Sequence, residues 1–119
     1  MFDSISVLMY YYAMNKIFQN KKSKQLYAAF LELKTVDEVA RFCRDLMTES
    51  EIEEFIGRFD VAVNLAQGKS QRTVSSETGV SIATVTRVNQ WLQRGMDGYK
   101  TVISRLNHHN SSSKLASAG

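Results

Sequence analysis

The 119-residue sequence contains no proline, only one cysteine and only one tryptophan. Proline is the strongest helix breaker, so its absence favours a mostly helical chain. The single cysteine, Cys43, cannot form an intramolecular disulfide, which excludes a small secreted fold held together by cystines. The length and the 44% hydrophobic content fit one small globular domain and exclude a large multidomain enzyme.

The sequence also lacks an apolar run long enough to cross a bilayer, which takes about 20 residues. The first largely apolar stretch, residues 5–14, has neither the basic start nor the small-residue end of a secretory signal. Residues 1–20 are expected to form an apolar extension, either an added helix that packs on the domain or sequence ahead of a true start at Met14. Residues 107–119 are polar and serine-rich, and a disordered tail is expected there.

Acidic side chains are scarce in the C-terminal half. Residues 68–119 carry seven basic and two acidic residues, whereas residues 48–67 carry one basic and five acidic residues. The C-terminal half is therefore the part expected to approach a polyanion. The acidic segment is explained by helix capping and solvation, because it follows a capping threonine.

Apolar residues recur at three- and four-residue steps, which predicts three amphipathic helices before Gly68. The first covers about residues 21–33. The second and third follow Thr35 and Thr48, each of which stands three residues before a glutamate, the spacing of a capping box. The side chains expected to be buried are Leu26, Ala29, Phe30, Leu33, Val39, Phe42, Cys43, Leu46, Ile52, Phe55, Ile56, Phe59, Val63 and Leu65.

Residues 70–92 have the pattern of a helix-turn-helix. A short helix is expected to end at about Thr78, a turn to form at Gly79, and a second helix to begin with Ser81 as its N-cap. Ser75 is small enough to let the two helices approach. Apolar residues are needed where the helices face each other, and four valines stand there: Val74, Val80, Val85 and Val88.

The outer face of the second predicted helix carries hydroxyl, amide, methyl and guanidinium groups, which can contact base edges and phosphates in a major groove. No aspartate or glutamate occurs between Gly79 and Met96. Arg94, Lys100 and Arg105 extend the basic surface. The candidate DNA-binding residues are Lys69, Gln71, Arg72, Ser81, Ile82, Ala83, Thr84, Thr86, Arg87 and Gln90.

From about Leu26 to Leu106 the chain resembles the bacterial Trp repressor superfamily and, within it, the YerC/YecD group of TrpR-related proteins. The resemblance lies in residues 48–51 with Gly57-Arg58, residues 68–72, and residues 81–87 with Asn89, Leu92, Gly95 and Gly98-Tyr99. It implies an all-α, Trp-repressor-like domain over residues 21–106 that forms an intertwined homodimer. It also implies double-stranded DNA as partner, no membrane partner, and a place in the bacterial cytoplasm with the nucleoid.

The resemblance also implies a ligand pocket, which this sequence alters. In the Trp repressor the indole of the corepressor lies between two arginines, whose positions Arg58 and Arg87 match, and Thr48 matches a further ligand contact. The repressor has glycine after the second arginine, whereas this chain has Val88, and the isopropyl group is expected to fill the hollow. We therefore expect a vestigial pocket formed by Thr48, Arg58, Arg87 and Val88, and no tryptophan corepressor.

No catalytic, metal or cofactor site is expected. His108 and His109 adjoin the predicted tail, with only Cys43 as another soft ligand, and the six glycines are dispersed rather than gathered in a phosphate-binding loop. The leading prediction is a dimeric DNA-binding transcriptional regulator that acts as a repressor. The alternative is a protein interaction module, in which the helix-turn-helix is a scaffold and Trp91 helps to dock a partner.

Overall fold

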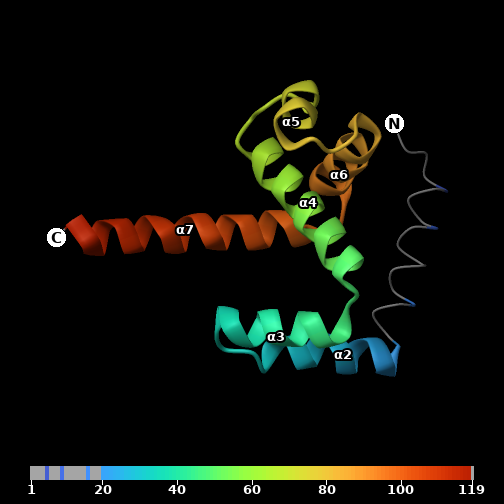
Figure 1. Cartoon of the computed structure of the whole chain (residues 1–119), viewed down its shortest axis with the longest axis vertical. Coiled ribbons are helices and arrows are strands. Elements are labelled where there is room, and N and C mark those ends of the chain that lie inside the picture. The colour runs from blue at the N-terminus through green and yellow to red at the C-terminus, as the bar shows by residue number, and fades with distance from the viewer. Residues whose placement is uncertain (1–4, 6–8, 10–15, 17–19, 119) are drawn as a thin grey trace. The chain divides into compact units, whose positions relative to one another are not determined.

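The computed structural model describes residues 5, 9, 16 and 20–118, with side chains up to residue 110. All regular elements of this part of the chain are helices, which confirms the all-α prediction. They are α2 (Lys21–Leu31), α3 (Val36–Leu46), α4 (Glu49–Ala66), α5 (Gln71–Thr78), α6 (Ile82–Arg94) and α7 (Gly98–Ala118) (Figure 1). The predicted apolar extension over residues 1–20 lies almost wholly outside the described residues. Among the described helices, none combines the length and the apolar character needed to span a bilayer.

The chain divides into two compact units, residues 1–47 and 48–119. In the first unit, α2 and α3 form a helical hairpin in which the rings of Phe30 and Phe42 meet edge-on, with centroids 5.1 Å apart. Neither helix contains a buried residue, and Cys43, expected to be buried, is half-buried.

Threonine caps begin two helices where the sequence predicts them. The Thr35 hydroxyl accepts a 3.1 Å hydrogen bond from the backbone N–H of Glu38 at the start of α3. At the start of α4, Thr48 and Glu51 form a complete capping box: each side chain accepts a bond from the other's backbone N–H, at 3.1 and 3.0 Å. The bond from the Thr48 backbone, and then the bond with its side chain, lowers the pKa of the Glu51 carboxyl.

The second unit is built on α4. Helices α5 and α6 pack against α4 and against each other, and the start of α7 packs against α4 and α6 (Figure 1). The expected burial of Phe55 and Ile56 is wrong, since they are 42% and 62% exposed. They precede the last two turns of α4, where its buried residues lie. The core consists of Val61, Ala62, Leu65, Val74, Val85, Val88, Leu92 and Ile103.

Helix α7 continues through residues 107–118, where a disordered tail was expected. This segment contains neither proline nor glycine, so no residue in it breaks the helix. Serine and asparagine lower helix propensity only slightly, which explains why composition alone predicted a tail.

Candidate nucleic-acid interface

Helices α5 and α6 are joined by a sharp turn at Gly79, as the sequence predicts. Gly79 has φ of 76°, in the left-handed region that a residue without Cβ adopts at little cost. The Ser75 hydroxyl donates a 2.7 Å hydrogen bond to the carbonyl oxygen of Val80, and the Thr78 hydroxyl donates a 2.6 Å bond to the carbonyl oxygen of Val74. The first bond joins α5 to the turn before α6, and the second lies within the last turn of α5.

The four valines lie between the helices, which confirms their predicted role. Val74 and Val85 are fully buried, Val88 is 3% exposed, and Val80 is partly buried against the same core. Because β-branched side chains have few rotamers, this packing fixes the orientation of α6 on α4 and α5.

The candidate contacts on α6 form one exposed stripe. Steps of four residues connect Ile82, Thr86 and Gln90, and steps of three and four connect Ala83 with Thr86 and Arg87, so these side chains lie on one outer face. Thr84 is half-buried, and its backbone N–H donates a 3.2 Å hydrogen bond to the Ser81 hydroxyl, the predicted N-cap. The exposed members of the stripe are Ile82, Ala83, Thr86, Arg87 and Gln90.

Three candidate DNA-binding residues, Lys69, Gln71 and Arg72, lie just before α5 or in its first turn, and they differ in their hydrogen bonds and ion pairs. Arg72 is exposed, as a phosphate contact requires. Gln71 is bonded to α6, because the Thr86 hydroxyl donates a 2.8 Å hydrogen bond to its amide oxygen. The ammonium group of Lys69 is 2.9 Å from the Glu77 carboxylate and 2.8 Å from the Asn64 amide oxygen, so its charge is already paired.

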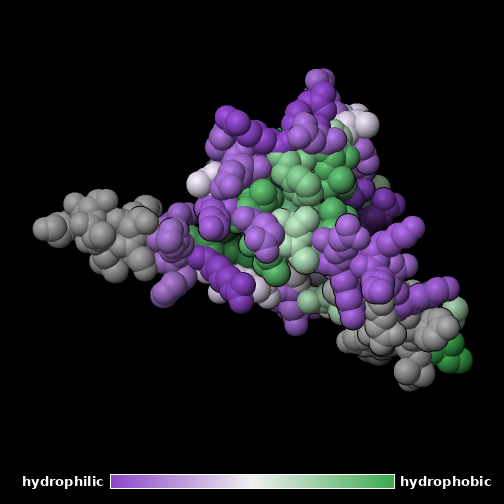
Figure 2. Space-filling view, turned by 90° about the horizontal axis from the view of Figure 1, so that it is seen from below, coloured by the Kyte–Doolittle hydropathy of each residue, from purple (hydrophilic) through white to green (hydrophobic). Residues whose placement is uncertain are grey.

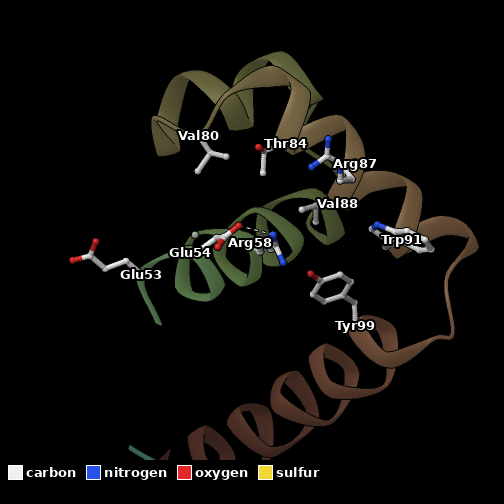
Figure 3. Close-up of a pocket in the computed structure, with 10 residues that line it drawn as sticks. Glu53, Glu54, Arg58, Val80, Thr84, Arg87, Val88, Trp91 and Tyr99 are labelled. Atoms are coloured by element: carbon white, nitrogen blue, oxygen red, sulfur yellow. Dashed lines mark hydrogen bonds and ion pairs between the residues drawn. The ribbon is translucent and has the colours of Figure 1, made fainter. Parts of the chain in front are cut away.

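A pocket of about 360 Å³ lies behind the outer face of α6. Three helices, α4, α6 and α7, and Val80 in the turn between α5 and α6 line it, all within the second unit, and Figure 3 shows how these residues surround it. Arg58 and Arg87 come from facing helices, α4 and α6. The lining residues are Glu53, Glu54, Gly57, Arg58, Val80, Thr84, Arg87, Val88, Trp91 and Tyr99.

Three of the four residues expected in a vestigial pocket, Arg58, Arg87 and Val88, line this one. Thr48 is not among the lining residues and instead caps α4. Inside the pocket, Arg58 Nη2 lies 2.6 Å from Glu54 Oε1, and the Arg58 guanidinium carbon is 5.6 Å from the centre of the Phe55 ring.

The sequence analysis did not assign seven of the lining residues to a pocket: Glu53, Glu54, Gly57, Val80, Thr84, Trp91 and Tyr99. Helical spacing is the signal that could have found most of them. Residues 53, 54, 57 and 58 share one face of α4, and residues 84, 87, 88 and 91 share one face of α6. The contribution of Tyr99 has no such signal, since it depends on how α7 returns to α4. Its ring lies 6.5 Å from the Phe59 ring.

Comparison with known proteins places this geometry in a family. The sequence profile of the Trp repressor protein matches residues 21–107. The YerC protein of Bacillus subtilis (strain 168) is 36% identical over 88 residues, which are 74% of this chain and 85% of YerC. A Trp operon repressor homolog from Vibrio cholerae is 37% identical over 62 residues, 51% of this chain and 60% of the homolog.

Solved structures agree with the sequence matches. The crystal structure of a TrpR-like protein from Eubacterium eligens has a TM-score of 0.72 and 39% sequence identity to this chain, and covers 78% of this chain and 95% of its own. The profile match runs without interruption from α2 into α7 and includes the whole helix-turn-helix. On this agreement of sequence and fold, the chain belongs to the Trp repressor family.

Proposed function

We propose that this protein is a sequence-specific regulator of transcription that binds double-stranded DNA as a homodimer and represses by occupying its operator. The observation that carries the proposal is the exposed stripe of α6, which rests on buried valines and has no acidic residue from Gly79 to Met96. A rigid helix with hydroxyl, amide and guanidinium side chains suits the major groove. Membership of the Trp repressor family supports a DNA-binding regulator.

Affinity and selectivity come from different parts of this surface. Arg72, at the start of α5, flanks the stripe and is exposed, so it can contact a phosphate on either side of the groove. The seven basic residues against two acidic ones in residues 68–119 supply sequence-independent attraction. The stripe on α6, above all Arg87, then distinguishes base pairs.

Unburied apolar surface supports the homodimer. Leu31 and Val36 at the tip of the α2–α3 hairpin are 86% and 87% exposed, and Ile56 on α4 is 62% exposed. Figure 2 shows apolar patches (green) on the surface of the protein. Burying one such side chain contributes about 1.5–3 kcal/mol, so a second copy that covers several of them adds substantially to a small core. Two copies also present two reading helices to two half-sites.

We further propose that DNA binding does not require tryptophan, and the pocket supports this. A ligand carboxylate would have to compete with Glu54 for Arg58, which Glu54 already contacts at 2.6 Å. The chain's only indole, Trp91, already forms part of the wall. The orientation of α6 depends on buried valines of this chain rather than on a bound molecule.

The test is the salt dependence of binding to a duplex enriched from a random pool, measured for the wild type, Arg87→Ala and Arg41→Ala. Arg41 is a matched control, because it is an exposed arginine on α3, paired with Asp37 and outside the helix-turn-helix. Affinity should fall steeply with salt, and Arg87→Ala should lower it by about 10- to 100-fold with an unchanged circular dichroism spectrum. Equal affinities for the three proteins, or binding that ignores salt, would favour the protein interaction module instead.

A further inference from the structure

A hydrogen bond joins the two helices of the candidate reading head on their outer side. Thr86 Oγ1 donates a 2.8 Å bond to Gln71 Oε1, across 15 residues of sequence. Gln71 is the first residue of α5, and Thr86 lies in the middle of α6. The side-chain bonds at the two N-caps, Ser70 and Ser81, span only three residues and stay within their own helices.

The direction of this bond determines which hydrogen-bond donors and acceptors Thr86 and Gln71 have left for contacts with DNA. A threonine hydroxyl has one proton, and Thr86 gives it to Gln71, so its oxygen remains only as an acceptor beside its methyl group. Gln71 accepts through its amide oxygen, so its NH₂ group keeps two donors. The pair therefore presents donors at the start of α5 and an acceptor with a methyl group on α6.

We propose that Gln71 and Thr86 act as one specificity-determining pair, in which Gln71 holds the Thr86 hydroxyl as an acceptor and Thr86 thereby selects an adenine–thymine base pair in each half-site. This inference rests on the DNA-binding function proposed above. Gln71 is the positioning residue of the pair, and its NH₂ group contacts a phosphate oxygen at the edge of the groove.

The chemistry of the major groove supports this selection. An adenine–thymine pair presents the N6 amine of adenine, a donor, together with the methyl group of thymine. The Thr86 oxygen matches the amine, and the Thr86 methyl group matches the thymine methyl. Guanine would oppose the Thr86 oxygen with two acceptors, N7 and O6, and cytosine supplies a donor without a methyl group. Without Gln71, the Thr86 hydroxyl could rotate and donate to guanine, and the preference would be lost.

The experiment measures base preference separately from overall affinity. Duplexes carrying each of the four base pairs at every half-site position are competed for the wild type and the variants Thr86→Val, Gln71→Ala and their combination. Thr101→Val is the matched control, because Thr101 is exposed on α7, outside the helix-turn-helix. Thr86→Val preserves side-chain shape and replaces the hydroxyl with a methyl group. It should reduce the preference for adenine–thymine at one position per half-site by about fivefold.

Gln71→Ala should lose the preference at the same position, and the double variant should lose no more than either single variant, since both remove one shared interaction. Gln71→Glu provides a sharper test. Its carboxylate still accepts the Thr86 proton but cannot donate to a phosphate, so base preference should persist while affinity falls equally for all sequences.

Two different failures can be told apart. If the wild type enriches a motif, but Gln71→Ala leaves the position altered by Thr86→Val unchanged, the pair proposal is wrong and the proposed function stands. The same conclusion follows if Thr86→Val lowers affinity equally for every base pair. If the wild type shows no salt-dependent binding to any duplex, the proposed function is wrong, and the pair proposal with it.

Discussion

The ammonium group of Lys69 bridges two helices: it lies 2.9 Å from the Glu77 carboxylate on α5 and 2.8 Å from the Asn64 amide oxygen on α4. The loop between α4 and α5 is therefore tied down at both ends. The bridge also places one of the two acidic residues of the C-terminal half directly against a basic one. Lys69 is thus a smaller contributor to the positive surface than its charge suggests, which affects how DNA binding should respond to mutation.

Glu77→Gln should strengthen DNA binding. The substitution removes a negative charge and releases the Lys69 ammonium for a phosphate, so affinity at low salt should rise roughly threefold and the salt dependence should steepen by about one phosphate contact. Fluorescence anisotropy over a series of salt concentrations measures both quantities. In the same series, Lys69→Met should weaken binding less than Arg72→Ala does. An equal loss of affinity in the two variants would mean that the ion pair with Glu77 does not weaken the contact between Lys69 and DNA.

Gly79→Ala should destabilise the fold by about 1–2 kcal/mol through backbone strain alone. A Cβ at Gly79 would meet no atom within 4 Å, so the cost comes from the φ of 76° and not from a clash. Urea unfolding monitored by circular dichroism measures the change. Gly98→Ala is the matched control, because its Cβ also meets open space at the start of α7, and alanine favours a helix. A Gly79→Ala variant as stable as the wild type would refute the role of the turn.

Glu51→Gln should lower stability at neutral pH and have little effect in acid. The pKa of Glu51 in the folded chain is lowered by the bonds to Thr48, so the carboxylate stabilises the fold above its ordinary pKa of 4.5. This stabilisation is lost as the pH falls through the lowered folded value. Thermal unfolding of both proteins from pH 7 to pH 2.5 should show curves that converge in acid. If the difference in unfolding temperature between the two proteins widened as the pH fell, the capping box could not be the cause of that difference.

L-Tryptophan should give no saturable heat when titrated into the wild-type protein, and it should not raise the unfolding temperature, since only a ligand of the folded state does so. Isothermal titration calorimetry and differential scanning calorimetry make the two measurements. Glu54→Ala should be titrated alongside the wild type. The substitution removes the carboxylate that lies 2.6 Å from Arg58 and that would compete with the carboxylate of tryptophan. Stoichiometric tryptophan binding by the wild type would overturn the proposal that the pocket does not serve a corepressor.

Local signals in the sequence predicted the helix-turn-helix closely. The Thr48 and Ser81 caps, the Gly79 turn and the buried Val74 all lie where they were expected, because each depends on residues only a few positions apart. Capping and turn formation are short-range effects. A valine at helical spacing between two short helices is easily buried where the helices face each other.

Features that depend on tertiary packing were harder to predict. Periodicity identified the apolar character of Phe55 and Ile56, but these side chains are exposed, and the buried residues of α4 are Val61, Ala62 and Leu65. Residues distant in the sequence also create the bond between Thr86 and Gln71 and the pocket lining by Tyr99. A periodic pattern within one helix cannot predict these contacts, because they join residues from different helices.

The most direct test of the account is selection of duplexes from a random pool by the purified full-length chain, with and without L-tryptophan, followed by sequencing. The account predicts enrichment of a symmetric motif whose half-sites lie about one helical turn apart, with equal recovery in both conditions. A motif recovered only with tryptophan would contradict corepressor independence. No enrichment in either condition would contradict the proposed DNA-binding function itself.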